Sequence, residues 1–149
     1  MERNVKFQHR FLVNAPIEKV AEFHSRSSSM AAVTPPPISV QIHQAPPFLA
    51  EGDEMKFTLW AGPLPIRWHA RMENISANGF DDRQVHGPFS EWVHRHRYHA
   101  VNEQTTEVVD DITLRLSSKP LWWVIGLGMR ISLPILFAFR AWKTQRLLQ

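Results

Sequence analysis

Hydrophobic and polar residues alternate along most of the chain, and this period of two is typical of β-strands with one buried face. The first such run covers residues 5–13. After three consecutive prolines at 35–37 the alternation returns and continues almost to residue 116. It predicts six further strands, at residues 38–42, 55–59, 66–73, 80–84, 89–99 and 108–116. Because the connections between these strands are short, we expect an antiparallel meander.

Two parts of the chain depart from this period and are typical of helices. Residues 14–25, "NAPIEKVAEFHS", begin with Asn14 as a candidate N-cap and carry apolar residues on one side. A second short helical piece precedes the prolines. From Pro120 onwards the sequence predicts a long helix, which Pro134 should kink and two glycines should loosen. The predicted order is therefore strand, two short helices, six strands and one long helix.

Composition adds limits to this α+β pattern. The 149 residues, 44% hydrophobic and 21% charged, fit a single globular domain over residues 1–149. The absence of cysteine excludes disulfides and thiolate metal ligands. The first 13 residues contain no apolar run of the kind that directs secretion, so we expect a cytoplasmic protein. A net charge of +3 does not demand an anionic partner.

The segment "GPFSEWVHRHRYH", residues 87–99, separates two kinds of side chain onto the two faces of one strand. Aromatic rings and imidazoles share one face, and Arg95 and Arg97 lie on the other. If the more apolar face of each strand points inwards, the early strands supply an apolar wall and the last three supply a polar one. The polar inward positions are Asp82, Gln84, His94, His96 and Asp110.

These inward polar groups need partners, because burying each one unpaired costs about 1–3 kcal/mol. A structural network, such as His94 or His96 paired with Asp110, explains any single residue at least as well as a functional role does. Five such positions exceed what a sealed core needs, however. One apolar wall facing one polar wall is the layout of a small-molecule pocket.

Several phrases of the sequence resemble the SRPBCC (START-like) superfamily, near its polyketide cyclase/dehydrase-type branch. They are "APIEKVAEFHS", "TPP", "FDDRQVHGPFSEWVHRHRY" and "VVDDITLRL", followed by a long terminal helix. The resemblance implies a helix-grip fold, in which a seven-stranded antiparallel sheet curls around the C-terminal helix and encloses a cavity. It implies apolar ligands and no universal catalytic residue. The residues that match the family phrases are Asp82, Arg83, Gly87, Pro88, Phe89, Trp92, His94, His96 and Asp110.

The first functional interpretation is a protein that binds an apolar or amphipathic small molecule, such as a lipid, a polyketide-like or an aromatic compound. The terminal helix and the loops at 45–52 and 61–65 would form its entrance. Aromatic and methionine side chains would supply apolar contact, and the imidazoles would orient a polar group. The side chains expected to meet the ligand are Met55, Phe57, Trp68, Met72, Asp82, Gln84, Trp92, His94, His96, Tyr98 and Asp110.

The alternative is an enzyme of the cyclase or dehydratase type. His94 or His96 would act as general base, oriented by Asp110, on a ketone-bearing substrate. The same three residues also form a two-histidine, one-carboxylate set of the kind that binds metal ions. Because His-x-His arises easily in a chain with eight histidines, we expect no metal and no cofactor.

The opposite face of the sheet carries a basic stripe that could suggest nucleic acid. Its members are Arg67, Arg71, Arg83, Arg95 and Arg97. Acidic residues interleave with them, namely Glu73, Asp81, Glu91 and Asp111. Cross-strand ion pairing explains this pattern without a ligand, so we expect no nucleic-acid partner.

The terminal helix raises the question of a membrane. Residues 121–139 contain one charge, Arg130, and approach the ~20 residues that a span requires. Arg130 would lie in mid-membrane, Pro134 interrupts the segment, and the sheet needs a helix to cover its inner face, so we predict a core helix. The helix is less charged than the resemblance implies, which leaves room for membrane association or a homodimer. The candidate surface contacts are Leu121, Trp122 and Trp123.

Overall fold

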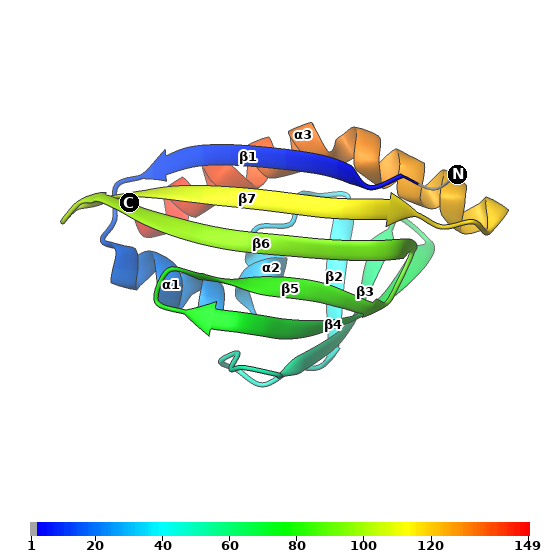
Figure 1. The fold of residues 1–149 in the computed structure, drawn as a ribbon, viewed down its shortest axis with the longest axis horizontal. Coiled ribbons are helices and arrows are strands. Elements are labelled where there is room, and N and C mark those ends of the chain that lie inside the picture. The colour runs from blue at the N-terminus through cyan, green and yellow to red at the C-terminus, as the bar shows by residue number, and fades with distance from the viewer. Residues whose placement is uncertain (1–2) are drawn as a thin grey trace.

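Seven strands form one antiparallel sheet in the computed structural model, which describes residues 3–149. The strands are β1 (Val5–Val13), β2 (Ile38–Gln44), β3 (Glu54–Ala61), β4 (Leu64–Ser76), β5 (Gly79–His86), β6 (Phe89–Asn102) and β7 (Thr105–Leu116). Their order across the sheet is β1-β7-β6-β5-β4-β3-β2 (Figure 1). The strands from β2 to β7 thus form the expected meander, and β1 pairs with β7 at the far edge.

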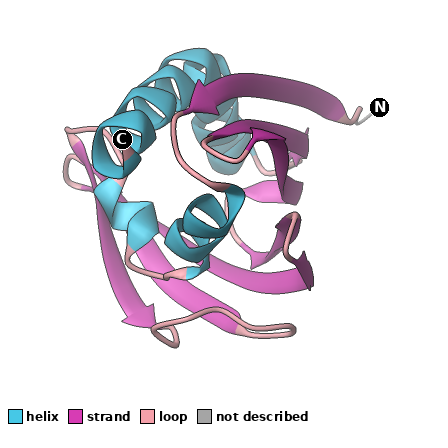
Figure 2. Cartoon of the chain, turned by 90° about the vertical axis from the view of Figure 1, so that its left-hand side faces the viewer, coloured by secondary structure: helices cyan, strands magenta, loops and turns pink. Residues whose placement is uncertain are grey.

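Three helices lie on one side of this sheet. The short helices α1 (Ile17–Ser25) and α2 (Ser29–Ala32) connect β1 to β2, and α3 (Pro120–Leu148) ends the chain. Figure 2 shows the strands curving round the helices rather than lying flat beside them. The curvature brings both β1 and β6 against α3. The seven-stranded helix-grip architecture predicted from the sequence is confirmed.

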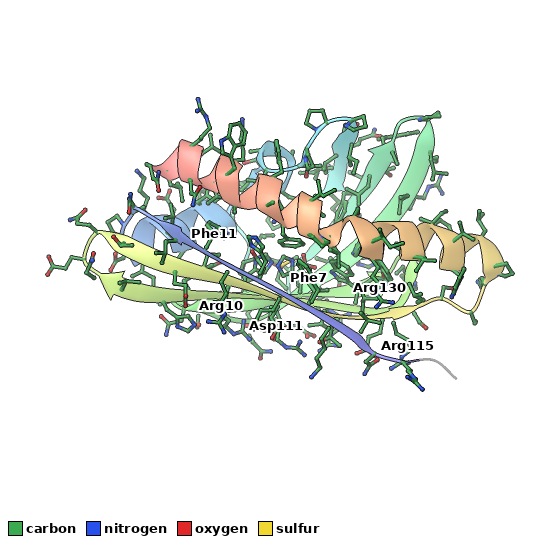
Figure 3. All side chains as sticks on the ribbon, turned by 90° about the horizontal axis from the view of Figure 1, so that it is seen from above. Phe7, Arg10, Phe11, Asp111, Arg115 and Arg130 are labelled. Carbon is green, nitrogen blue, oxygen red and sulfur yellow. The ribbon has the colours of Figure 1, made fainter. Side chains whose placement is uncertain are left out.

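Side chains alternate between the two faces of the sheet, as the sequence pattern predicts. On β1, Phe7 and Phe11 point towards α3, and Arg10 points to the opposite face, which also carries Asp111 (Figure 3). The Phe7 ring lies 5.5 Å from the Phe137 ring of α3, measured between centroids. The inner face is therefore the face that forms the core.

The charged outer face pairs across its strands. Arg83 donates to Glu73 and Arg97 donates to Asp81, each at 2.8 Å. Arg95 donates to the hydroxyl of Thr113 on the neighbouring strand at 3.1 Å. The cross-strand interpretation of the basic stripe is thus confirmed for Arg83 and Arg97.

The ends and irregular residues of the helices differ in detail from the sequence-based expectation. Pro16, not Asn14, occupies the N-cap of α1, and the Asn14 N–H donates to the side chain of Gln149. The helix α3 continues through Pro134, and Pro134 itself is exposed to solvent. Gly126 is buried, and a β-carbon there would lie 3.3 Å from the Phe89 ring. This glycine therefore permits close approach of helix and sheet.

Gly79 provides a test of how tightly the hairpin between β4 and β5 is built. Its φ is +146°, and a β-carbon would lie 1.9 Å from the carbonyl oxygen of His96. We expect Gly79→Ala to lower the free energy of unfolding by about 2 kcal/mol or more. Gly128→Ala is the matched control, because nothing lies within 4 Å of its β-carbon position and alanine favours the helix by about 0.5–1 kcal/mol. Equal urea midpoints for the two variants would contradict this assignment.

Candidate functional site

A cavity of about 180 Å³ lies between the inner face of the sheet and the helices. Most of its wall is apolar, because the strands and α3 present aromatic, aliphatic and methionine side chains to it. Representative apolar lining residues are Met55, Phe57, Trp68, Met72, Phe80, Trp92, Leu133 and Phe137. The polar side chains that contribute most to its chemistry are His24, Asp82, His94, His96 and Arg140.

Among the polar residues of the cavity, His94 is held by a buried carboxylate. Its Nε2–H donates to Oδ1 of Asp110 at 2.8 Å, and both side chains are buried. Burial alone would raise the pKa of Asp110, but the hydrogen bond from His94, together with nearby positive charge, holds it below its usual value. Asp110 lies behind His94 and fixes the orientation of its ring.

His96 lies beside this pair but is not satisfied by it. Its ring stacks between His94, with centroids 3.7 Å apart, and Phe80, at 4.2 Å. Neither ring nitrogen has a hydrogen-bond partner among residues 3–149. Nδ1 lies 3.7 Å from Oδ1 of Asp110, which is too far for a hydrogen bond. Burial, together with the neighbouring His94, His24 and arginine charges, lowers the pKa of His96 well below its usual value. At neutral pH it is therefore an uncharged ring with one donor and one acceptor free.

Asp82 presents a second unsatisfied group to the same space. Its Oδ1 is buried and has no partner within the described part of the chain. Burial raises the pKa of Asp82 to about 6, although His94 and Arg140 act in the opposite direction. A carboxyl group with this pKa changes its protonation state close to neutral pH, as titratable groups in functional sites often do.

Two further polar residues complete the polar end of the cavity. Arg140 reaches it from α3, with its guanidinium 5.3 Å from the centroid of the Phe137 ring. Burial lowers the pKa of Arg140, and the carboxylates of Asp110 and Asp82 oppose that shift. His24, on α1, donates from Nδ1 to the carbonyl of Val20 at 2.9 Å, so its other nitrogen remains available as an acceptor.

Asp82, His94 and His96 are also the described residues that come nearest to a metal-binding set. One potential ligand atom of each lies within 4.8 Å of the others. The two imidazole rings, however, stack with only 24° between their planes. Lone pairs in nearly parallel rings do not converge on one ion at the ~2.0–2.1 Å that imidazole ligands need. As arranged, the cluster suits hydrogen bonding to an organic group better than it suits a metal.

The structure brings most of the sequence-predicted site residues to the cavity. Those that line it are Met55, Phe57, Trp68, Met72, Asp82, Trp92, His94 and His96. Gln84, Tyr98 and Asp110 are not among the described lining residues. Gln84 instead binds the backbone of Phe89 and closes the β5–β6 turn, and Tyr98 is buried in a second core cluster.

The expected entrance is only partly in place. Leu49, from the loop at 45–52, lines the cavity. Residues 61–65 do not, because they form the tight connection between β3 and β4. This part of the predicted entrance is wrong.

Sequence reasoning missed His24 and Arg140. His24 lies four residues after Val20, on the buried side of α1. Arg140 lies three residues after Phe137 and seven after Leu133, both of which are buried on α3. This helical spacing could have indicated that both side chains face inwards, but neither was assigned an inward position from the sequence.

Comparison with known proteins bears on the fold. No family model matches the sequence, and a search of the curated proteins gives no match. An aromatase/cyclase of Streptomyces is similar in structure, with a TM-score of 0.70 at 16% identity over 97% of this chain and 96% of that one. The chain shares the helix-grip fold of this enzyme.

Two further helix-grip structures agree with this conclusion. Norcoclaurine synthase of Thalictrum flavum, as a point mutant in complex with a transition-state analogue, has a TM-score of 0.69 at 11% identity, covering 99% of this chain and 96% of that one. A major latex-like protein of Panax ginseng has a TM-score of 0.66 at 11% identity, covering 97% of each chain. The helix-grip fold that the family resemblance implies is thus confirmed.

Replacement by phenylalanine should change the folding stability very differently at the two stacked histidines. His94→Phe leaves the buried carboxylate of Asp110 without its hydrogen bond, so we expect a loss of about 3–5 kcal/mol in the free energy of unfolding. His96→Phe keeps the ring stack and removes two unsatisfied nitrogens, so stability should stay within about 1 kcal/mol of the parent or rise. Urea unfolding at neutral pH measures both. Equal losses would show that His96 has a structural partner after all.

Asp82 should give the folding stability a distinct pH dependence. The unfolded chain releases this proton near the ordinary pKa of 3.8, whereas the folded chain retains it to about 6. Stability contributed by the protonated carboxyl is therefore lost as the pH rises through this window. Asp82→Asn should stabilise the protein by about 2–3 kcal/mol at neutral pH and have little effect near pH 4. A variant that changes stability equally at both pH values would contradict the assignment.

Proposed function

We propose that the protein binds an apolar or amphipathic small molecule in the cavity, with a polar group of that molecule directed at His96 and Asp82. Within residues 3–149, five buried side-chain nitrogen or oxygen atoms have no hydrogen-bond partner, and the proposal rests on the three of them that belong to residues lining the mainly apolar cavity. They are Oδ1 of Asp82 and both ring nitrogens of His96. A folded protein gains stability by removing such groups unless a ligand or water satisfies them.

The available donors and acceptors narrow the kind of polar group. Neutral His96 offers both a donor and an acceptor, and the guanidinium of Arg140 offers only donors. Asp82 changes from donor to acceptor with a pKa of about 6. A carbonyl, hydroxyl or carboxyl group at one end of a hydrophobic molecule fits this set. The apolar remainder would contact aromatic rings such as Trp68 and Trp92.

Acid–base catalysis of the cyclase or dehydratase type is the second candidate function. It is favoured by the hydrogen bond from His94 to Asp110, because a carboxylate that orients an imidazole is a common feature of general bases. That bond occupies Nε2 of His94, so a proton would have to be taken by Nδ1 of His94 or by the unpaired His96. Among proteins of similar fold, one is an aromatase/cyclase and another is norcoclaurine synthase.

The binding proposal predicts that His96→Phe weakens ligand affinity without unfolding the protein. With 1-anilinonaphthalene-8-sulfonate as a fluorescent amphipathic probe, we expect about tenfold weaker binding, which corresponds to one or two lost hydrogen bonds. His86→Phe, on an exposed position of β5, is the matched control and should bind like the parent. Native mass spectrometry of the purified chain would identify any molecule that co-purifies.

The outcomes of this experiment separate the candidates. Equal probe affinity for the parent and His96→Phe would overturn the proposed orientation of the ligand. If probe binding weakens as expected, a ketone-bearing substrate screen with His94→Asn tests the catalytic alternative. Turnover that depends on His94 would favour the enzyme.

A further inference from the structure

The outer face of α3 is apolar and uncovered. Of its most hydrophobic 18-residue window, with a mean hydropathy of 1.7, only 17% is buried. A core helix that merely closes a cavity would hide most of such a window. Instead Ile131 is 69% exposed and Ile135 is 78% exposed. No other element of residues 3–149 lies over this side of the helix in Figures 2 and 3.

The exposed side chains form one continuous stripe. Their spacing of three and four residues places them on a single face of the helix over roughly 30 Å. The members of this outer stripe are Leu121, Val124, Gly128, Ile131, Ile135, Ala138 and Trp142. No charged residue interrupts it between its first and last members, since Arg130 and Arg140 lie on other faces. The stripe is therefore a hydrophobic surface of the size and shape of an interaction site.

The charged residues of α3 itself and of the segment just before it have one sign. All 14 acidic residues of the chain lie within residues 1–111, whereas residues 112–149 contain six basic residues and no acidic one. Lys119 precedes the stripe, and Lys143 and Arg146 follow it. Exposed tryptophans lie near both ends, Trp123 at the start and Trp142 at the finish. Apolar side chains flanked by tryptophan and basic residues are typical of helices that lie in the interface of an anionic bilayer.

The inner face of α3 excludes a membrane-spanning role for this folded state. Leu133 and Phe137 are buried in the core, and Arg140 reaches the polar end of the cavity. The helix also packs on β1, β6 and β7. Spanning a bilayer would remove all these contacts and expose the inner face of the sheet. The stripe can meet lipid only while the helix lies parallel to the surface.

We infer that the outer stripe of α3 docks the folded protein on the surface of a membrane that contains anionic lipids. Apolar side chains of the stripe enter the boundary between headgroups and acyl chains, and Lys119, Lys143 and Arg146 meet the headgroups. A second copy of the chain is a less suitable partner for the stripe. A symmetric pairing of two stripes would bring together two helices whose charged residues are all basic. The inference is independent of the proposed ligand.

The test is flotation of the full chain with vesicles of phosphatidylcholine, with and without phosphatidylglycerol. We expect binding that requires phosphatidylglycerol, weakens with salt, and falls about tenfold in the double variant Ile131→Gln, Ile135→Gln. The matched control is Leu12→Gln with Val101→Gln, two apolar residues exposed elsewhere on the molecule. The control should bind like the parent. Lys143→Glu with Arg146→Glu should lose the preference for anionic lipid.

Each remaining outcome would overturn the inference. Absence of vesicle binding, or equal losses in the stripe variant and its control, would show that the stripe is not a lipid surface. A dimer that dissociates in the stripe variant while no vesicle binding occurs would assign the stripe to a second copy. Resistance of the bound protein to alkaline extraction would indicate a spanning helix. Circular dichroism and urea unfolding confirm that each variant is folded.

Discussion

A single long helix has to cover the inner face of a seven-stranded sheet, and the arrangement of the protein follows from this constraint. A sheet of this width cannot be filled by one helix unless it curls, and Figure 2 shows that it does. The helix packs closely on β1, β7 and β6, where Gly126 permits close approach. Towards β3 and β4 the two layers separate, and the cavity lies between them. The same helix thus forms a cavity wall on one side and an uncovered apolar surface on the other.

The polar end of the cavity combines one satisfied pair with several unsatisfied groups. The hydrogen bond from His94 to Asp110 makes the buried carboxylate tolerable and fixes one ring. His96 and Asp82 have no comparable partner among residues 3–149, and burying their unpaired atoms costs stability. A chain selected for stability alone would have apolar residues there. We therefore interpret the unsatisfied atoms as the part of the site that is completed by a ligand.

Much of this architecture could be predicted because alternation is a local property of the sequence. The period of two located all seven strands and placed His94 and His96 on the inner face. Contacts between elements that are distant in the sequence were harder to predict. The sequence showed that Asp110 faces inwards, but its location behind His94 depends on the register between β6 and β7. Arg140 was missed because its role depends on which face of α3 meets the sheet. The bonds of Gln84 to the backbone of Phe89 were equally inaccessible, because they depend on the conformation of the β5–β6 turn.

Nitrogen-15 NMR of the histidine side chains across pH, with and without a fatty acid as an amphipathic carboxylate, would show directly whether His96 meets the ligand. We expect that His96 stays neutral at pH values where free histidine is charged, and that its ring-nitrogen shifts change when the fatty acid is added. His94 should keep a protected Nε2–H throughout. A His96 ring that titrates like free histidine, with shifts that do not change on addition of the fatty acid, would show that His96 is not the group that binds the ligand.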